Sequence, residues 1–592
     1  MCGFFTIFDK DFKLSKARAA LKLLVHRGPN GTAEYTTKNH YMGHNRLSII
    51  DLSDAAQQPF VSEDNLVSVV VNGEIYNFLS LRDELIKLGY KFSSNSDCEV
   101  VLAGYLKWGI DGLLQRIRGM FAFTIHDTEA AKIFAVRDHL GIKPLFYHVG
   151  QNRMSTASEL SAIVEYLELS PTKHFDYTAL YDFLTYSYVP APKTPFTAIK
   201  KLEPGHYLQF DVENNKLQIN QYWDVEFQNI LNHSEEVAVS NIQKLLVASV
   251  TEELQADVEV GLFLSGGLDS SAVAFLASRI FGEKIRAFSL FFENPIYDES
   301  SRIKDCVDFL KLKHEHFTVN EGLAKKVFAS QLSHFNEPFG DTSFIPTNIV
   351  SEVASKHVKV VLTGDGGDEV FGGYTRYEFF EKRPYQRLKL PRVINNILNS
   401  NILNRLKFVK KLVNRIQLYF TFDDFEVYTR FMGGLIHSEK NIYRKRWKIP
   451  NNYDDYWYYR KYYKSELPVV KRFQYLDLKT YLPDDNLTKV DRMSMRHGIE
   501  ARVPLLNLNL IEYLFRLPSN IVYDSKNPKH LLKKALGNQL PESILKGSKR
   551  GFSIPSHDWF VKDSEFRNLN ELIINMFLKK TKFSVKNNIH KR

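Results

Sequence analysis

The segment Leu262–Ser271, with the sequence LFLSGGLDSS, constrains the fold of this chain more than any other feature. It joins an apolar run typical of a buried strand to a turn with two adjacent glycines, and then to a helix that begins near Asp269 or Ser270. From about residue 235 onward, strand-like runs such as KIRAFSLFF and VKVVLTG alternate with helical segments. This alternation predicts an α/β domain with a doubly wound parallel sheet, in which ligands bind at the carboxyl ends of the strands.

The same segment has the chemistry of a phosphate-binding loop. Two glycines allow the backbone to approach an anion, and the helix dipole reinforces the hydroxyl and amide donors at the start of a helix. The loop lacks the lysine that many nucleotide-binding loops carry. A strand, a glycine turn and a helix also arise from packing alone, but the sequence Ser-Gly-Gly-Leu-Asp-Ser-Ser at a strand end favours phosphate binding.

A second loop with the same placement supplies acidic groups. The segment Val360–Tyr374 reads VVLTGDGGDEVFGGY, so that Asp365, Asp368 and Glu369 follow a predicted strand among glycines. Three carboxylates this close repel one another unless a cation neutralises them or one takes up a proton. A solvated acidic turn is the alternative, but together with the phosphate loop the pattern favours a nucleotide and metal site.

The N-terminal part of the chain has a different pattern. Up to about residue 160, β-rich runs such as NLVSVVVNGEIYNF and GMFAFTIHD alternate with one clear helix, FLSLRDELIKLGY, which indicates an α+β domain. Four prolines in residues 188–208 disfavour both helix and central strand, so we expect a hinge there. Because 592 residues exceed the size of one hydrophobic core, two domains are expected.

Composition limits the cellular setting and the chemistry. With 44% hydrophobic and 25% charged residues, and no apolar run near the ~18 residues that a membrane span needs, we expect a soluble cytoplasmic protein. The three cysteines, Cys2, Cys98 and Cys306, lie far apart, which excludes a disulfide framework and a zinc site built on close cysteine pairs. Any cysteine that acts must therefore act singly.

The net charge of +10 is concentrated in two regions. Residues 381–416 hold ten Lys or Arg and one acid, and residues 546–592 hold eleven against four. In the first region apolar residues recur at helical spacing between basic ones, which describes an amphipathic basic helix. We favour a helix docked on the core over a membrane or polyanion surface, and we expect no nucleic-acid partner.

Cys2 has the chemistry of an N-terminal nucleophile. A small residue after the initiator Met generally permits removal of that Met, which would expose a cysteine with a free α-amine. An amine with a pKa of about 7.7–8.0 can take the thiol proton near neutral pH, so that nucleophile and base belong to one residue. The segments MCGFF, HRGPNG, GHNRLSIIDLS, VNGEIYN and SDCE follow in order up to Glu99. Together they resemble a class II glutamine amidotransferase domain, in which Cys2 would attack the amide of L-glutamine.

That resemblance implies a role for further polar residues of the five segments. Arg46 would bind the α-carboxylate of glutamine, which a guanidinium fork matches. Asn72 and the amide of Gly73 would stabilise the oxyanion. The amino group of glutamine would be bound by Glu74 and Asp97. As structural alternatives, Arg46 pairs locally and Asn72-Gly73 forms a hairpin turn.

The glycine loop resembles that of the ATP pyrophosphatases, which grips the leaving pyrophosphate and does not support γ-phosphate transfer. This difference accounts for the missing lysine. The resemblance implies that Asp269 and Asp368 bind Mg²⁺, a hard cation that prefers carboxylate oxygens. It assigns ATP binding to Phe263, Leu264, Ser265, Gly266, Gly267, Asp269, Ser270, Leu290, Thr363 and Gly364.

Over residues 2–565 the order of these two domains resembles glutamine-hydrolysing asparagine synthetase. The segments EPFGDTSFIPT, LPDDNLTKVDRMSMRHGIEARVPLLN and KRGFSIPSHDW agree with this family. By this resemblance Lys489 faces the phosphates and balances the acyl-adenylate transition state, and Asp365 accepts a proton as ammonia attacks. Many relatives have glutamate at the position of Asp365, which makes its role as a base less secure. The segment RDHLGIKPLFY is expected to support the contact between the domains.

The resemblance implies an architecture and a reaction. A class II glutaminase domain at residues 2–205, with an N-terminal-nucleophile sandwich (αββα), would precede a linker at 206–234. A synthetase domain at 235–565, containing a basic helical region at 381–470, would be followed by a basic tail at 566–592, whose last segment, KKTKFSVKNNIHKR, is expected to be mobile. The expected reaction amidates the carboxylate acceptor L-aspartate with ammonia from glutamine and converts ATP to AMP and pyrophosphate. A homodimer is consistent with the resemblance.

Two other functions remain open at this point. One is amidation of another carboxylate, such as a uronic acid of a surface polysaccharide, by the same two-domain chemistry. The other is a non-catalytic protein on this fold that binds a polyanion or a membrane surface through residues 381–416. An intact Cys2 and the paired acidic loops disfavour the non-catalytic alternative, but they do not identify the acceptor.

Overall fold

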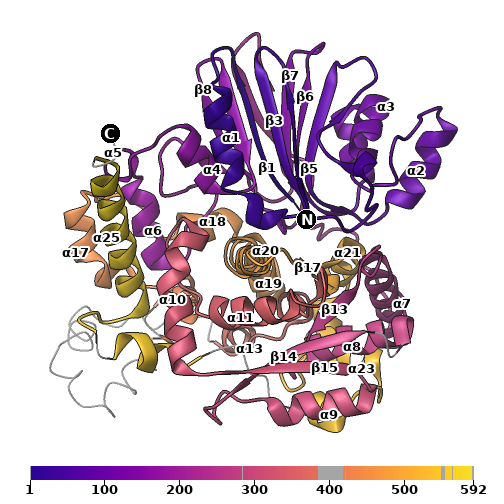
Figure 1. Ribbon diagram of the computed structural model, residues 1–592. Helices are drawn as coiled ribbons and strands as arrows, with labels where there is room; N and C mark the ends of the chain where they lie inside the picture. The colour runs from indigo at the N-terminus through magenta and orange to yellow at the C-terminus, as the bar shows by residue number, and fades with distance from the viewer. Residues whose placement is uncertain are drawn as a thin grey trace.

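The computed structural model describes residues 2–282, 285–383, 418–419, 422–547, 554–562 and 564–589. The described chain folds into two parts, which lie one above the other in Figure 1. The upper part contains two antiparallel sheets from residues 3–221, and the lower part contains a parallel sheet surrounded by helices. The predicted succession of an α+β domain and an α/β domain is confirmed.

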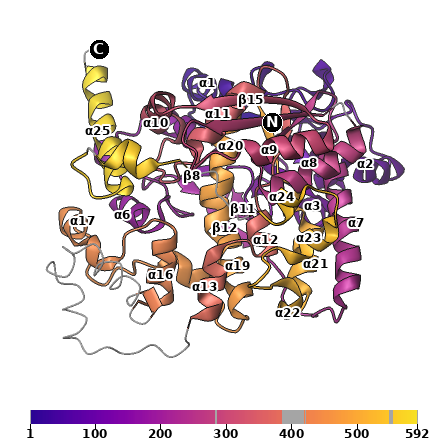
Figure 2. The same ribbon diagram turned by 90° about the horizontal axis from the view of Figure 1, so that it is seen from below.

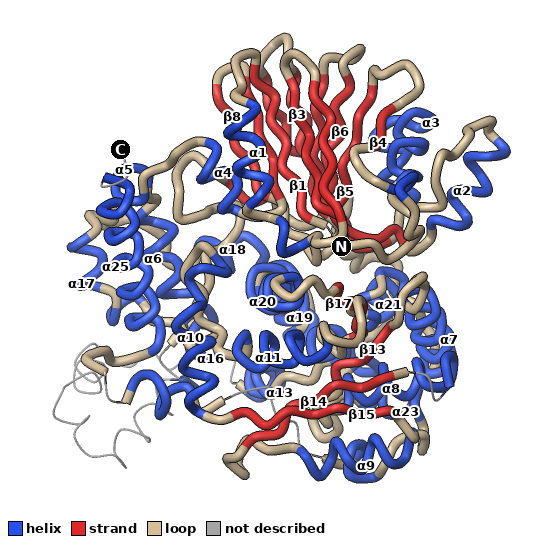
Figure 3. The backbone as a smooth tube through the Cα atoms, viewed as in Figure 1, coloured by secondary structure: helices blue, strands red, loops and turns tan. Residues whose placement is uncertain are grey.

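The N-terminal part is an αββα sandwich (Figure 3). One six-stranded sheet has the order β10-β8-β9-β1-β3-β2 and the other has the order β12-β11-β7-β6-β5-β4. Helices α1 and α4 cover the first sheet, and α3 with α2 covers the second. The helices are α1 (Leu14–Lys22), α2 (Phe78–Lys87), α3 (Glu99–Arg116) and α4 (Leu160–Tyr166). The strands are β1 (Gly3–Asp9), β2 (Gly31–Thr36), β3 (His40–Arg46), β4 (Phe60–Val61), β5 (Val67–Ile75), β6 (Gly119–Asp127), β7 (Lys132–Arg137), β8 (Phe146–Gly150), β9 (Arg153–Ala157), β10 (Lys200–Lys201), β11 (His206–Asp211) and β12 (Lys216–Gln221).

Strand β5 shows why these sequences form a two-sheet core. Successive side chains of a strand point to opposite faces. Val69 and Val71 therefore pack toward α2 and α3, whereas Val70 packs with Phe4 and Met42 between the two sheets. Both faces of β5 are buried, which accounts for its continuous apolar run and for the close packing of its carboxyl end, where Asn72 and Gly73 lie.

The predicted linker at 206–234 is wrong over its first half. Strand β11 pairs with β7, and β12 pairs with β11, so the second sheet continues to Gln221. The predicted hinge at 188–208 is also wrong, because Tyr188, Val189 and Ala191 are buried. Prolines there shape a packed segment between the sandwich and the second domain, since Ala191 N donates to Asp484 Oδ2 at 2.8 Å.

The second domain is built on a five-stranded parallel sheet with the order β15-β14-β13-β16-β17. Its central strands place Leu262 opposite Leu362, and Leu362 opposite Arg502, so that three distant segments end at one edge. The predicted doubly wound sheet is therefore confirmed. The strands are β13 (Val260–Phe263), β14 (Arg286–Phe292), β15 (Lys313–Val319), β16 (Val360–Leu362) and β17 (Glu500–Arg502). Flanking helices include α7 (Glu235–Glu253), α8 (Leu268–Phe281), α11 (Phe344–Ala354), α20 (Leu487–Met495) and α23 (His530–Leu536).

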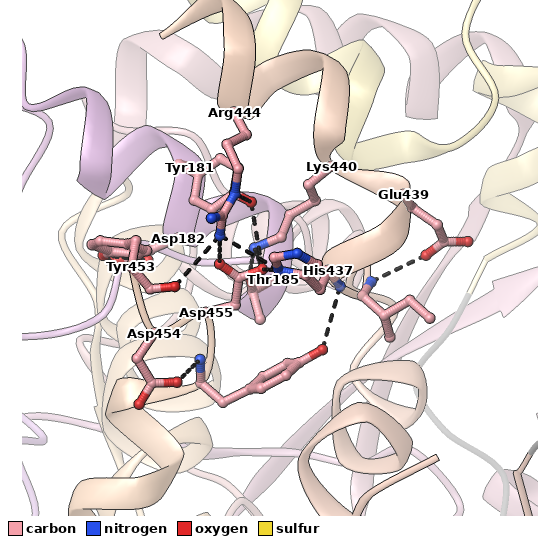
Figure 4. A network of polar contacts seen from close by, with 12 residues as sticks. Tyr181, Asp182, Thr185, His437, Glu439, Lys440, Arg444, Tyr453, Asp454 and Asp455 are labelled. Carbon is pink, nitrogen blue, oxygen red and sulfur yellow. Dashed lines mark hydrogen bonds and ion pairs between the residues drawn. The ribbon is translucent and has the colours of Figure 1, made fainter. Parts of the chain in front are cut away.

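Two cations in the described part of the basic region 381–470 are held internally. Lys440 and Arg444 pair with the buried Asp455 at 3.4 and 2.8 Å, and Tyr181 of α6 (Tyr177–Tyr186) contacts the same carboxylate at 3.4 Å. Figure 4 shows these side chains converging between α6 and α17 (Asn441–Arg446). These two buried cations are not available to a polyanion. The predicted amphipathic helix at 402–416 lies outside the described residues.

Within the predicted basic tail at 566–592, Leu569–Ile589 forms helix α25. Ile573, Ile574 and Phe577 are buried, and the Phe577 ring stacks on Phe175 with 5.6 Å between centroids. Figure 2 shows α25 beside α6, so the C-terminal segment packs on the end of the N-terminal half. Among the described residues, no helix has the length and the apolar character of a membrane span.

Candidate active sites

The first candidate site is formed where β1 and β5 lie side by side. Cys2 immediately precedes β1, and its backbone N–H donates to Asn72 Oδ1 at 3.1 Å. Within the described part of the chain, the Asn72 Nδ2 group has no hydrogen-bond acceptor although it is buried. A buried donor without an acceptor costs free energy unless a ligand satisfies it. Its place beside Cys2 therefore suits an oxygen that gains negative charge during attack on a carbonyl.

Burial has a second consequence for this site. It raises the pKa of the Cys2 thiol, against the lowering effect of the chain's amino terminus. The thiol is therefore protonated at neutral pH and needs a base at the moment of attack.

Gly73 is required where the backbone of β5 meets β6. A Cβ atom at this position would lie 2.0 Å from the carbonyl oxygen of Met120, so any other residue would force the strands apart. The close packing holds the backbone of residues 72–74 in one position next to Cys2. This arrangement suits a preorganised set of donors for a developing charge.

Three carboxylates, here called the glutamine cluster, gather beside Cys2: Glu74, Asp97 and Glu500. Burial and the neighbouring Asp97 hold the pKa of Glu74 well above its ordinary range, and burial also raises the pKa of Asp97. Asp97 Oδ2 accepts the Ile75 N–H at 2.8 Å, which fixes its position. A cationic amino group entering this cluster would favour the ionised form of Glu74, which burial and Asp97 disfavour.

Arg502 supplies the positive charge of this cluster from the other domain. Its Nη2 lies 3.5 Å from Glu74 Oε2, and its Nε donates to Glu500 Oε1 at 2.5 Å. Its Nη1 donates to the carbonyl oxygens of Glu253 and Gln255, both at 2.7 Å. Burial alone would raise the pKa of Glu500, but the amino terminus, Arg502 and Lys143 lower it to about 2. Strand β17 thus completes this first candidate site.

Arg46 does not face an open space in this structure. Its two terminal nitrogens donate to the carbonyl oxygens of Ser53, at 2.7 Å, and Asp51. The guanidinium orders the loop after β3 in the absence of a ligand, which is the local pairing considered from the sequence. Its predicted role toward the glutamine carboxylate stays a prediction.

Arg27 joins the Cys2 backbone to the second domain. This fully buried residue donates from Nε to the Cys2 carbonyl oxygen at 3.1 Å and from Nη1 to Asp491 of α20 at 2.8 Å. Glu159 Oε1 accepts from Arg27 and also pairs with Arg492 at 2.7 Å. Arg27 belongs to the HRGPNG segment, but no role was predicted for it from the sequence. The available signal was an arginine directly before a glycine and a proline, after the apolar run at 23–25.

The second candidate site is a cavity of about 790 Å³ at the carboxyl edge of the parallel sheet. Among the residues predicted to bind ATP, Gly266 alone does not line it. Asp365, Asp368 and Lys489 also line the cavity. The predicted residues that line it are Phe263, Leu264, Ser265, Gly267, Asp269, Ser270, Leu290, Thr363 and Gly364.

The two loops at this edge touch one another through glycines. Gly266 has φ +75°, which an L side chain rarely adopts, and it turns the chain into α8. Ser265 Oγ and Ser270 Oγ lie 3.0 Å apart across that turn. A Cβ atom on Gly364 would lie 2.5 Å from Ser270 N, so the loop after β16 reaches the start of α8 only because it has no side chain there. Such a helix start suits phosphate oxygens.

Asp269 and Asp368, here called the nucleotide cluster, face each other across these loops. Lys529, which directly precedes α23, contacts both: its Nζ pairs with Asp269 Oδ2 and lies 2.6 Å from Asp368 Oδ1. A cation already bridges the two carboxylates, and the donor set is the oxygen chemistry that Mg²⁺ prefers. The residues present therefore fit a divalent cation. Lys529 was missed from the sequence because it lies 260 residues from Asp269.

Lys489 enters the same cavity from α20. Its Nζ lies 3.1 Å from Asp341 Oδ2 and 2.9 Å from Ser343 Oγ. Burial alone would lower the pKa of Lys489, but Asp341 and Asp365 raise it, so the side chain stays charged. Asp365 and Lys489 are thus close enough to influence each other, whereas Asp365 N donates only weakly to Thr363 Oγ1 at 3.4 Å.

The two sites are physically connected through strand β17. Thr363, at the nucleotide cavity, donates its N–H to the carbonyl oxygen of Arg502 at 2.9 Å, while the Arg502 side chain contacts the glutamine cluster. The motif that contains Glu500 and Arg502 was recognised in the sequence, but neither residue was given a role. Two opposite charges at alternate positions of a short strand were the available signal.

Two family models match this chain, one in each half. The family described as asparagine synthase matches residues 241–587, and the family described as glutamine amidotransferase domain matches residues 1–223. An asparagine synthetase (glutamine-hydrolyzing) of Bacillus subtilis strain 168 is 29% identical over 97% of this chain and 90% of its own length. A putative asparagine synthetase of Mycobacterium bovis is 33% identical over 92% and 84%.

Other similar proteins have different names. Amidase chry2 of Gibberella zeae is 28% identical over 92% of this chain and 86% of its own length. Among solved structures, glutamine phosphoribosylpyrophosphate amidotransferase from B. subtilis aligns with a TM-score of 0.29 and 17% identity, over 50% of this chain and 68% of that one.

Proposed function

The chain belongs to the asparagine synthase family, and from that premise we propose that it synthesises asparagine from L-aspartate. Family membership supports glutamine-dependent amidation that uses ATP. The proposal adds the acceptor, an acyl-adenylate intermediate with AMP and pyrophosphate as products, and Mg²⁺ as the metal. The observation that carries it is one chain with two chemically distinct sites, each contacted by residues of strand β17.

At the first site, the proposed nucleophile is the Cys2 thiolate. After removal of the initiator Met, the free α-amine of Cys2 would accept the thiol proton. The sulfur would form a bond to the amide carbon of glutamine, and the carbonyl oxygen would take up negative charge next to Asn72 Nδ2 and the Gly73 amide. Protonation of the leaving nitrogen releases ammonia. The acyl-enzyme is then hydrolysed to glutamate.

At the second site, the proposed reaction activates a carboxylate. The acceptor carboxylate attacks the α-phosphorus of ATP, and the bond to the pyrophosphate oxygen breaks. The start of α8 would hold the leaving pyrophosphate through Ser265, Gly267 and Ser270, and Lys489 would offset its growing charge. Mg²⁺, held by Asp269 and Asp368, would supply charge neutralisation across the phosphates. Ammonia then displaces AMP, and Asp365 is proposed to take the proton.

Ammonia must reach the second site as the free base, because ammonium has no lone pair. The contacts of Arg27 and Arg502 between the domains are buried, which supports transfer through an interior that excludes water. Exclusion of water also protects the acyl-adenylate from hydrolysis.

The test is pyrophosphate release in the presence of ATP, Mg²⁺ and glutamine, measured with L-aspartate, L-glutamate, a uronic acid or buffer alone. A site built to pair polar groups discriminates by ~10⁴-fold against analogues that leave them unpaired, so aspartate is expected to stand out. The nucleotide product is expected to be AMP. Release of ADP and phosphate would contradict the proposed role of the glycine loop.

A second candidate function is amidation of a different carboxylate by the same chemistry. It is favoured by relatives named amidase, at 28% identity over 91–92% of this chain. The same panel separates the two. If a uronic acid stimulates pyrophosphate release and aspartate performs no better than buffer, the second candidate is correct and the two-site mechanism remains.

A further inference from the structure

Lys529 lies at the point where the nucleotide loops leave a gap between two carboxylates. Its side chain is buried, with 8% exposed, although the three preceding residues are exposed. Its backbone has φ +58°, an unfavourable value for a residue with a long side chain. The chain therefore accepts backbone strain at this position while directing an ammonium group inward.

The surroundings of Lys529 are shaped to admit this side chain. A Cβ atom on Gly373 would lie 2.0 Å from Lys529 Cε and 2.0 Å from Asp368 Oδ1. The GG pair after α12 (Gly367–Phe371) thus leaves the space through which the lysine reaches Asp368. The ammonium of Lys529 contacts both carboxylates and so serves as the counter-ion of the nucleotide cluster.

The two lysines of the cavity are held differently. Lys489 donates to a carboxylate and to a hydroxyl that belong to one loop, Asp341 and Ser343. Among the described residues, Lys529 Nζ has hydrogen-bond and ion-pair partners only in Asp269 and Asp368, the two groups that a divalent cation would take. A metal ion at this place must displace the ammonium, which lies beside an open cavity of about 790 Å³.

We propose that Lys529 is an exchangeable counter-ion that occupies the metal position before nucleotide binds and moves to the phosphate oxygens when Mg²⁺-ATP enters. The proposal rests on the proposed function of this cavity. In this proposal Lys529 supplies the lysine that the sequence of the glycine loop lacks, from a segment 260 residues away. A flexible ammonium is suited to this exchange, because it is a compact charge whose three donors serve carboxylates and phosphates alike.

The exchange predicts opposite effects on metal and nucleotide binding. In Lys529→Met, Mn²⁺ used in place of Mg²⁺ no longer has to displace an ammonium. The dissociation constant of Mn²⁺ from the nucleotide-free variant, measured by electron paramagnetic resonance, is expected to be about tenfold lower than that from the wild type. Binding of Mg²⁺-ATP, measured by calorimetry, is expected to weaken by about tenfold or more, because a charge-assisted contact to phosphate is lost.

Lys534→Met is the matched control. Lys534 lies on α23, which Lys529 directly precedes, and it pairs with Glu235 at the surface and does not line the cavity. Both dissociation constants are expected to match those of the wild type. If Lys529→Met leaves both constants unchanged, or weakens both, the exchange is refuted. If the wild type itself binds no ATP, the proposed function fails as well, so the two failures are distinguishable.

A second measurement uses the unmodified chain and does not depend on the folding of a variant. Acylation of Lys529 by a water-soluble ester, followed by mass spectrometry, is expected to be slow in the nucleotide-free protein. Mg²⁺ alone is expected to accelerate it several-fold by expelling the ammonium into the cavity, and Mg²⁺-ATP to slow it again. A rate that Mg²⁺ alone does not change would overturn the proposal.

Discussion

The glutamine cluster and the nucleotide cluster solve the same electrostatic problem in different ways. Each gathers carboxylates, buried in the first cluster and half-buried in the second, and in each a cation contacts carboxylates from segments far apart in the sequence. Arg502 is held by two backbone carbonyls and by Glu500 in addition to Glu74, and it is part of strand β17. Lys529 is held only by the cluster that it neutralises, as far as the described residues show.

The difference in anchoring indicates a difference in use. A guanidinium fixed by several acceptors cannot leave without depriving those buried acceptors of their hydrogen-bond donor. The glutamine cluster therefore keeps its counter-charge throughout the reaction. An ammonium with no other anchor can be replaced by a divalent cation of higher charge. The comparison therefore predicts one rigid site and one site that reorganises when its ligand binds.

The largest effect should separate the two sites completely. Cys2→Ala is expected to reduce glutamine-dependent amide formation by at least ~10³-fold, because the nucleophile is lost. Amide formation with ammonium chloride should stay within about twofold of the wild type, since the nucleotide cavity is intact. Both are measured as product amide. Equal loss of the two activities would mean that the sites do not act separately.

A change in the nucleotide cluster should produce the reverse pattern. Asp368→Asn removes one carboxylate from the proposed metal and is expected to lower formation of AMP and pyrophosphate by about 100-fold. Glutaminase activity without ATP serves as the internal control and should change less than about threefold. A larger fall in glutaminase activity than in pyrophosphate release would remove the distinction between the clusters.

Much of each site could be predicted because the residues lie in short local segments. Asn72, Gly73 and Glu74 are consecutive in the sequence, and Ser265 to Ser270 lie in one short segment. The counter-charges could not be predicted in this way. Arg502 and Lys529 reach their clusters through tertiary structure, and a sequence contains no distance between segments hundreds of residues apart.

The fold shows the same limit at its boundaries. Strand alternation predicted the parallel sheet, because period and glycine turns are local signals. The proline-rich segment at 188–208 was predicted to be a hinge from its composition. The buried Tyr188 shows that packing against other elements decided its structure. Composition describes what a segment can do alone, and here the neighbouring elements supplied the missing apolar contacts.

A smaller effect is expected when the fixed cation is weakened but not removed. Arg502→Lys keeps the charge and loses the fork that binds Glu500 and two backbone carbonyls, so Glu74 is no longer held in place. The KM for glutamine is expected to rise by roughly 10–30-fold, as for the loss of a charge-assisted hydrogen bond, with a smaller fall in kcat. Arg516→Lys, a partly exposed arginine that donates to Asn229, is the control. A KM equal to that of the wild type would show that Arg502 is not fixed for this purpose.

The smallest effect concerns the pH dependence of stability that Glu253 causes. The backbone carbonyl oxygen of Glu253 accepts a hydrogen bond from Arg502. Burial raises the pKa of the Glu253 carboxyl to about 8, with Arg502 opposing. The folded protein therefore keeps this proton between about pH 4.5 and pH 8, whereas the unfolded chain releases it, so rising pH favours unfolding across that window. Glu253→Gln removes this contribution. Between pH 6 and pH 7 the free energy of unfolding should therefore fall less in the variant than in the wild type, and the difference between the two changes should be about 1 kcal/mol. Urea unfolding at both pH values provides the measurement, and Glu236→Gln, at the exposed start of α7, should keep the wild-type dependence. Identical pH dependence in the wild type and Glu253→Gln would show that Glu253 is ionised in the folded protein. The surroundings of Arg502 would then carry one more negative charge.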